Sequence, residues 1–238
     1  DQEEIPIRTF NRALGLLVVF LVPLSWAGDP SDPMIKEVTI IGTKEEKQSL
    51  SGSGIQISAT ELKRHGYSDL NQIVSSVPGV YVREEDGYGL RPNIGIRGAT
   101  SERSQKITLM EDGVLIAPAP YSAPAAYYIT NASRLHTVEV LKGPSAIQSG
   151  PHTVGGAINL ITRPVPVEDF AELDLSMGTD GYHKFAGAAG YVMDNVGLLL
   201  EGFSYGSDGF KQLDGEGDTG FTRNDINLKM RWTPKTEL

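Results

Sequence analysis

The sequence contains no cysteine, and its 238 residues include only 21 Lys and Arg against 30 Asp and Glu. The absence of cysteine excludes a disulfide-stabilised scaffold and any metal site built on thiolates. A formal net charge of -9 argues against nucleic acid as a partner, because phosphate binding needs clustered Lys and Arg.

Recognisable catalytic motifs are absent as well. The chain has no Gly-x-Ser-x-Gly nucleophile motif, no His-Glu-x-x-His zinc motif and no phosphate-binding P-loop. The four histidines are scattered along the sequence, which favours structural or surface roles over a metal cluster. The sequence therefore predicts neither an enzyme nor a resident metal or cofactor.

Long hydrophobic runs are scarce, and the clearest one lies near the start of the chain. Two arginines precede an apolar stretch over residues 13–24, and Ser25 and Ala27 then offer the small residues that a signal peptidase reads. The run is about a dozen residues long, against the roughly 20 that a spanning helix needs. The pattern predicts a cleaved export signal over residues 1–27, with a membrane anchor or a buried helix as the alternatives.

Residues 28–54 are mostly polar and are expected to be a flexible segment. A short β-prone island interrupts them, made up of Glu37, Val38, Thr39, Ile40 and Ile41. An isolated strand has unpaired backbone groups that can add to the edge of another protein's sheet. The alternative is that the island forms the first strand of its own domain.

Residues 55–165 have the pattern of a small α+β domain. Ser58 followed by Glu61 is a capping box that predicts a short helix, and apolar residues at helical spacing predict a second one over residues 69–76. A turn at Asp112-Gly113 predicts a hairpin. The predicted strands cover Val80–Val82, Ile94–Ile96, Ile107–Met110, Val114–Ile116, Thr137–Leu141 and Ala157–Thr162.

Residues 166–238 contain longer segments in which apolar and polar residues alternate. A short turn separates two of these segments at residues 193–195, and a long acidic loop follows at residues 207–220. This arrangement is typical of outer-membrane barrels, although a soluble β-sandwich gives similar alternation. The predicted strands are Ala171–Met177, His183–Tyr191, Val196–Tyr205 and Ile226–Trp232.

Five motifs in the middle of the chain occur in the order seen in a known family. They are Leu70–Tyr81, Asn93–Gly98, Leu109–Val114, Val138–Pro144 and Val154–Arg163. In these motifs the chain resembles the plugs of TonB-dependent outer-membrane receptors. The resemblance implies an α+β plug domain followed by about four strands of an antiparallel transmembrane β-barrel, a fragment of a barrel of about 22 strands.

Among these receptors the chain is most similar to the ferric citrate type. That similarity lies in residues 93–98, 101–104 and 117–121, and the chain departs from it at Ala123, where those receptors tend to carry Gln. Ferric citrate receptors that signal carry an extra domain before the segment that corresponds to residues 37–41 of this chain, which we call the coupling segment. Only about ten residues separate Ala27 from Glu37, too few to bury a core, so no signalling role is expected.

The resemblance also implies roles for individual residues. Residues 37–41 correspond to the TonB box, which pairs with TonB by strand addition. Arg97 and Lys142 correspond to two plug cations that pair with barrel carboxylates and lock the plug, Lys142 replacing the usual Arg. The outward loops that contact ligand would contain Arg103, Pro120 and Tyr121, with a solvated loop charge and simple packing as the alternatives.

The function implied is active uptake of a ferric chelate, either ferric citrate-like or a siderophore, as transported ligand. Its partners would be TonB with the ExbB/ExbD energy complex and the lipid of a Gram-negative outer membrane, with the plug facing the periplasm. Haem, cobalamin or another metal chelate are alternative ligands. A secreted β-rich binding protein is the alternative of a different class.

Overall fold

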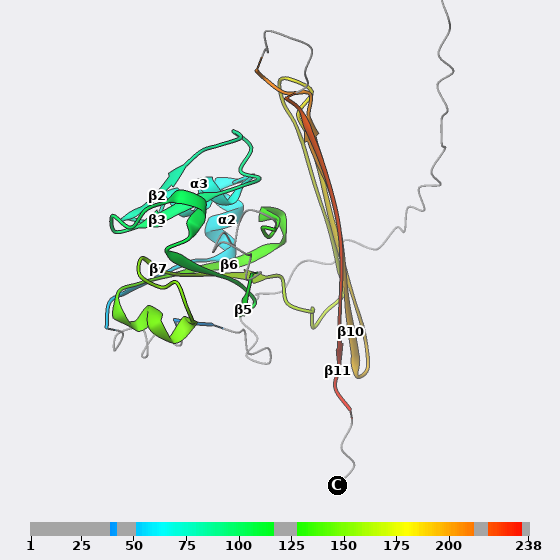
Figure 1. Ribbon diagram of the computed structural model, residues 1–238. Helices are drawn as coiled ribbons and strands as arrows, with labels where there is room; N and C mark the ends of the chain where they lie inside the picture. The colour runs from blue at the N-terminus through cyan, green and yellow to red at the C-terminus, as the bar shows by residue number, and fades with distance from the viewer. Residues whose placement is uncertain (1–38, 42–50, 117–127, 212–218, 235–238) are drawn as a thin grey trace, which may run out of the picture.

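The computed structural model describes residues 39–41, 51–116, 128–211 and 219–234. Within them the chain forms a mixed α/β domain, which we call the plug, and a separate sheet of long strands (Figure 1). The predicted export signal, Glu37, Val38, Pro120 and Tyr121 lie outside the described residues.

Two short helices lie near the start of the plug and begin where the sequence predicts. The first, α2 (Ala59–His65), has Ser58 at its N-cap, and the backbone N–H of Ser58 donates to Glu61 Oε2 at 2.8 Å. This reciprocal capping satisfies backbone groups that have no partner within the helix. The second, α3 (Leu70–Ser75), is capped by Asp69 and buries Leu70, Ile73 and Val74.

A five-stranded sheet forms the centre of the plug, in the order β1-β6-β7-β4-β5. Only β4 and β7 pair in parallel; the other neighbours are antiparallel. A two-stranded sheet of β2 and β3 lies beside it. The strands are β1 (Ser53–Ile57), β2 (Val80–Arg83), β3 (Asn93–Ile96), β4 (Ile107–Glu111), β5 (Val114–Leu115), β6 (Leu135–Lys142) and β7 (Gly156–Thr162). The 3-10 turns are η1 (Glu102–Ser104), η3 (Ala132–Arg134) and η4 (Pro144–Ser149).

The six predicted plug strands and the predicted hairpin are confirmed. The hairpin between β4 and β5 turns at Asp112 and Gly113, with φ of 49° and 77°. Two positive φ values in succession are the pattern of a type I′ turn, which suits the twist of the flanking strands. The additional strand β1, which the sequence does not predict, takes in Ser53 and Gly54 from the segment expected to be flexible and pairs with β6.

The two faces of the central sheet are covered differently. One face contributes Val138, Val140, Ile158 and Leu160 to the main apolar core, together with residues of α3 and of β2–β3. The other face holds a small cluster of Met110, Leu141, Ala146 and Ala157. Because side chains alternate along β6, Glu139 lies on the second face with Leu141.

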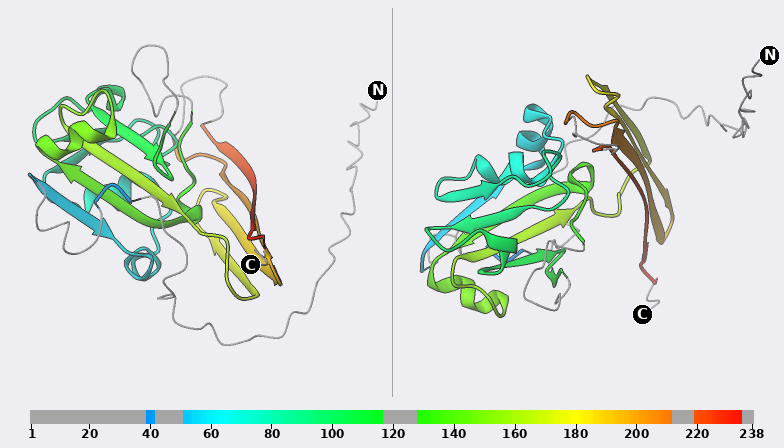
Figure 2. Two further views of the ribbon diagram at one scale, coloured as in Figure 1. Left: turned by 90° about the horizontal axis from the view of Figure 1, so that it is seen from below. Right: turned by 45° about the horizontal axis from the view of Figure 1, so that its top comes forward.

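The second sheet has the order β11-β10-β9-β8, with every neighbouring pair antiparallel. Its strands are β8 (Phe170–Met177), β9 (His183–Met193), β10 (Val196–Ser207) and β11 (Phe221–Trp232). Figure 2 shows them as a single curved layer along one side of the plug. All four strands are predicted from the sequence, and β11 starts five residues earlier than its pattern indicates.

The alternation along these strands separates a polar face from an apolar one. In β11, Ile226, Leu228, Met230 and Trp232 are exposed, while the residues between them are only partly exposed. The Leu198-Leu199-Leu200 run keeps the alternation in exposure, because Leu199 is 0% exposed and Leu200 is 53% exposed, but it places an apolar residue on the less exposed face. The less exposed face is the one that meets the plug.

The loops at the two ends of this sheet differ in length, as predicted. At one end Asp194 and Asn195 alone connect β9 to β10, and at the other residues 208–220 connect β10 to β11. Among the described residues, no helix has the length and apolar character needed to cross a membrane.

We predict that Gly156→Ala destabilises the plug far more than Gly66→Ala. A Cβ at Gly156 would lie 2.4 Å from the carbonyl oxygen of Leu141 on the neighbouring strand, at a φ of 149°. Gly66 also has a positive φ, but a Cβ there meets nothing within 4 Å. We expect a cost of about 3 kcal/mol or more at Gly156 and about 1 kcal/mol at Gly66.

Hydrogen exchange of the β6 and β7 amides measures both costs. Equal losses of protection in the two variants would contradict this account of the sheet.

Candidate functional site

Of the predicted coupling segment, the structure describes the last three residues, 39–41, and these lie against the plug. Ile41 is 2% exposed, and Ile40 packs against the small apolar cluster that contains Leu141 and Ala146. Figure 1 shows this segment in blue beside η4. Residues 39–41 form no strand in this structure, so neither a free strand nor the first strand of the plug sheet describes them.

A buried carboxylate on β6 holds this segment. Glu139 is 0% exposed and accepts a hydrogen bond from the backbone N–H of Ile40 at 2.8 Å. The Thr39 hydroxyl donates to its other oxygen. Glu139 cannot be recognised as a site residue from the sequence, because its neighbours give only the signal of a buried strand.

Arg97 and Lys142, the predicted locking cations, lie close together. A Cβ at Gly143 would lie 3.3 Å from Arg97 Nη1, and burial together with Arg97 lowers the pKa of Lys142 below its ordinary value. Lys142 Nζ donates to the backbone oxygen of Pro78 at 2.7 Å. Among the described residues, no ion pair joins Arg97 or Lys142 to a carboxylate.

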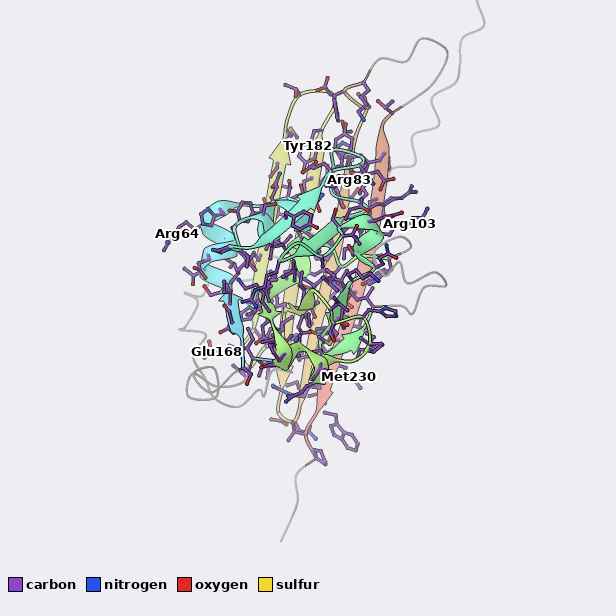
Figure 3. The ribbon with its side chains drawn as sticks, turned by 60° about the vertical axis from the view of Figure 1, so that its left-hand side comes forward. Arg64, Arg83, Arg103, Glu168, Tyr182 and Met230 are labelled. Carbon is purple, nitrogen blue, oxygen red and sulfur yellow. The ribbon has the colours of Figure 1, made fainter. Side chains whose placement is uncertain are left out.

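Arg103, the described member of the predicted ligand contacts, is exposed on η1. Its backbone has a φ of 48°, and its N–H donates to Asn93 Oδ1 at 2.8 Å, which fixes the turn after β3. Figure 3 shows its side chain directed outward, on the half of the plug nearer Tyr182 and away from Met230. Tyr182 lies at the end of the sheet that carries the long loop, so Arg103 lies toward that end.

The inward face of β10 and β11 meets the plug through charged and polar groups. Glu201, on β10, is 0% exposed and lies between two plug arginines, 3.9 Å from Arg134 Nε and 3.6 Å from Arg163 Nε. Asn227 donates to Glu201 at 2.9 Å from β11. This cluster cannot be recognised from the sequence, because its members lie far apart along the chain, on the plug and on the long strands.

Arg134 joins this cluster to the β4–β5 hairpin. Its Nη2 lies 2.9 Å from Glu111 Oε1, and the same carboxylate accepts hydrogen bonds from Tyr128 and Thr130. Burial opposes the charge on Arg134, but Glu111, Tyr128 and Glu201 outweigh it and raise the pKa of Arg134. The arginine is therefore held charged at the boundary between plug and sheet.

Alternate residues of β11 extend these contacts along the boundary. Lys229 Nζ donates to Asp112 Oδ2 and to the backbone oxygen of Arg163, both at 3.1 Å. Arg223 donates to the backbone oxygen of Ile129 at 2.7 Å. Such a boundary can hold the plug against the sheet in one register while remaining easier to rehydrate than an apolar core.

A cavity of about 330 Å³ lies beside this boundary. Its walls come from α2, α3 and η3 on the plug side and from the small residues of β9 on the other. The described residues contain no group of three or more His, Asp or Glu arranged to hold a metal ion.

We predict that Glu201→Gln loosens the plug from the sheet. The substitution removes the charge that Arg134 and Arg163 share and leaves each of these partly buried arginines with one carboxylate, Glu111 or Glu172, so we expect a cost of about 2 kcal/mol. The plug should then detach at a lower urea concentration. Proteolytic cleavage within residues 163–169, which connect the plug to the sheet, measures this detachment.

Asp174→Asn is the matched control, since Asp174 lies on β8 with its side chain 51% exposed beside Lys184. Asp174→Asn should change the free energy of plug detachment by less than about 1 kcal/mol, since the carboxylate that pairs with Lys184 is exposed to solvent. Equal shifts in the two variants would argue against a clamping role for Glu201.

Comparisons with known proteins agree with this arrangement. A family profile described as "TonB-dependent Receptor Plug Domain" matches residues 46–157. The chain is 26% identical over 222 residues to the vitamin B12 transporter BtuB of Photobacterium profundum, covering 89% of this chain and 36% of that protein. It is 27% identical over 221 residues to the ferric enterobactin receptor of Pseudomonas aeruginosa, covering 84% and 28%.

The fold is also that of solved receptor structures. The ferric citrate transporter FecA in its unliganded form superposes with a TM-score of 0.61 at 20% identity, covering 83% of this chain and 31% of that one. The chain thus spans about a third of the length of the proteins it matches. TonB-dependent receptors are Gram-negative outer-membrane proteins that transport and do not catalyse reactions. Residues 46–157 thus match the plug domain of TonB-dependent receptors, and the fold of the plug with the strands that follow is that of the start of such a receptor.

Proposed function

We propose that the protein takes up a ferric chelate across the outer membrane, driven through TonB. The observation that carries this proposal is a plug domain with a short N-terminal segment docked on it and an ion-paired boundary to barrel strands. A gated importer needs these three parts: a plug that closes the pore, a segment through which the plug can be pulled, and a barrel wall. The proteins it resembles include a ferric enterobactin receptor and a ferric citrate transporter, which favours iron chelates.

Residues 37–41 are the proposed TonB box. Glu37 and Val38 lie outside the described residues, and Thr39–Ile41 follow them directly into the docking contact. An extended segment of this kind, once released, can pair with the sheet edge of TonB through its backbone N–H and C=O groups. The energy supplied by ExbB and ExbD would then act on the plug through this strand.

Arg97 and Lys142 are the proposed locking cations. Their proximity and the buried position of Lys142 support a site that attracts carboxylates from another part of the barrel wall. Lys142 contributes one compact charge, so its contact would be less directional than that of an arginine.

Ligand contact is proposed at the end of the plug that carries Arg103, together with Pro120 and Tyr121. An exposed guanidinium supplies both positive charge and hydrogen-bond donors, which an anionic chelate requires. Cobalamin is a second candidate ligand, because one protein that the chain resembles is a vitamin B12 transporter.

Deletion of residues 36–42 in the full-length receptor tests the coupling assignment. Uptake should be lost, because no strand remains for TonB to pair with, while binding of ligand at the cell surface persists. Radiolabelled ferric citrate, ferric enterobactin and cobalamin would be measured for binding and uptake. Unimpaired uptake of the bound ligand would overturn the assignment.

Arg103→Ala, with Arg64→Ala as the control, tests the proposed ligand contact. Both arginines are exposed on the plug, but Arg64 lies on α2. We expect Arg103→Ala to weaken binding of the anionic chelate about tenfold or more, and Arg64→Ala to leave it unchanged. Equal affinities in the two variants would remove Arg103 from the site.

A further inference from the structure

Glu139 occupies an unusual place for a carboxylate. It lies in the middle of β6, which is flanked by β1 and β7, and its side chain is 0% exposed. Burying a carboxylate is costly unless hydrogen bonds or a counter-charge compensate the lost water. The position therefore calls for dedicated partners.

Two of its partners come from the coupling segment, 99 and 100 residues earlier in the sequence. Thr39 donates through its hydroxyl to one carboxylate oxygen, and Ile40 donates through its backbone N–H to the other at 2.8 Å. The third is Asn159 on β7, whose Nδ2 donates at 3.3 Å. The segment thus supplies two of the three hydrogen bonds that the described residues make to this carboxylate.

This contact blocks the activity proposed for the segment. Strand addition uses backbone N–H groups of the added strand, and the Ile40 N–H is already donated to Glu139. Ile41 is at the same time 2% exposed, so its side chain cannot reach a partner. TonB can therefore pair with residues 39–41 only after they leave Glu139.

Hydrogen bonds also connect this site to the barrel strands. Asn159 accepts from the Gly113 N–H at 2.9 Å through its Oδ1, so its amide joins Glu139 to the β4–β5 turn. The adjacent turn residue, Asp112, accepts from Lys229 of β11 at 3.1 Å. A displacement of the plug against β11 would act on the turn that orients Asn159.

We propose that Glu139 is the positioning residue that keeps the coupling segment docked, and that Asn159 and the Asp112-Gly113 turn link its hold to the barrel wall. Resting on the proposed function, this inference identifies what TonB must compete with. Loss of the Glu139 contact should make the segment available without ligand.

The test measures the reactivity of a cysteine at position 41 in the full-length receptor, with no ligand and no TonB. The described chain has no native cysteine, so Ile41→Cys introduces one reporter, and any cysteine beyond it is replaced first. Glu139→Gln should raise the maleimide labelling rate about tenfold or more, because the amide replaces one of the two acceptor oxygens with an NH2 group, which donates and does not accept. Glu102→Gln removes the same charge from an exposed site on η1 and should have no effect.

A second variant separates docking from plug stability. Thr39→Val removes a donor from the segment and leaves the plug sheet unaltered, and it too should raise labelling at position 41. A cysteine at Val140, which is 0% exposed in the core, should stay unlabelled in both variants. Unchanged labelling at position 41 in both variants, or equal increases at positions 41 and 140, would overturn the proposal.

The same variants can be tested for partner binding. Purified periplasmic TonB domain should bind Glu139→Gln about tenfold more tightly than the unaltered receptor in the absence of ligand, because the competent state is then more populated. Labelling requires neither TonB nor transport. If the receptor imports no ferric chelate but still shows the labelling difference, the proposed function is rejected and the docking role of Glu139 is retained.

Discussion

The position of residues 39–41 on the plug depends on hydrogen bonds to one buried carboxylate, that of Glu139. Glu139 lies on the second face of the central sheet, where the described residues form a small apolar cluster. The donors of Thr39 and Ile40 compensate its burial, and Ile40 completes the cluster. Segment and plug therefore stabilise each other: the segment gains a fixed position, and the carboxylate gains its hydrogen bonds.

The plug and the strands meet in a different manner from the plug's own core. The core is a continuous apolar cluster, whereas the boundary to β10 and β11 combines buried apolar side chains such as Phe203 with ion pairs and hydrogen bonds around Glu201 and Lys229. Water can replace such contacts one at a time, while opening an apolar core exposes its whole surface together. A plug that is displaced during transport, as proposed above, would benefit from this difference.

Local patterns account for most of what could be predicted. The capping box at Ser58, the turn at Asp112-Gly113 and the alternation of β8–β11 each depend on neighbouring residues, and the structure confirms them. Strand β1 could not be predicted, because a Gly- and Ser-rich start carries no strand signal and its pairing with β6 is long-range.

The site shows the same division between local and long-range information. The coupling segment stands out as a β-prone island, and Arg97 and Lys142 stand out through their motifs. Glu139 does not, because its partners lie 99 and 100 residues away and only the folded sheet brings them together. The role of Glu201 cannot be predicted from the sequence for a similar reason. Its partners, Arg134 and Arg163, belong to the plug, and its own strand shows only the alternation of a barrel strand.

The exchange rate of the Ile40 amide proton in the ligand-free, full-length receptor tests the central claim most directly. If Glu139 holds the segment, this amide exchanges many times more slowly than an unstructured peptide, and the addition of periplasmic TonB domain alters its rate. Exchange at the rate of an unstructured chain, with β6 still protected, would contradict the account.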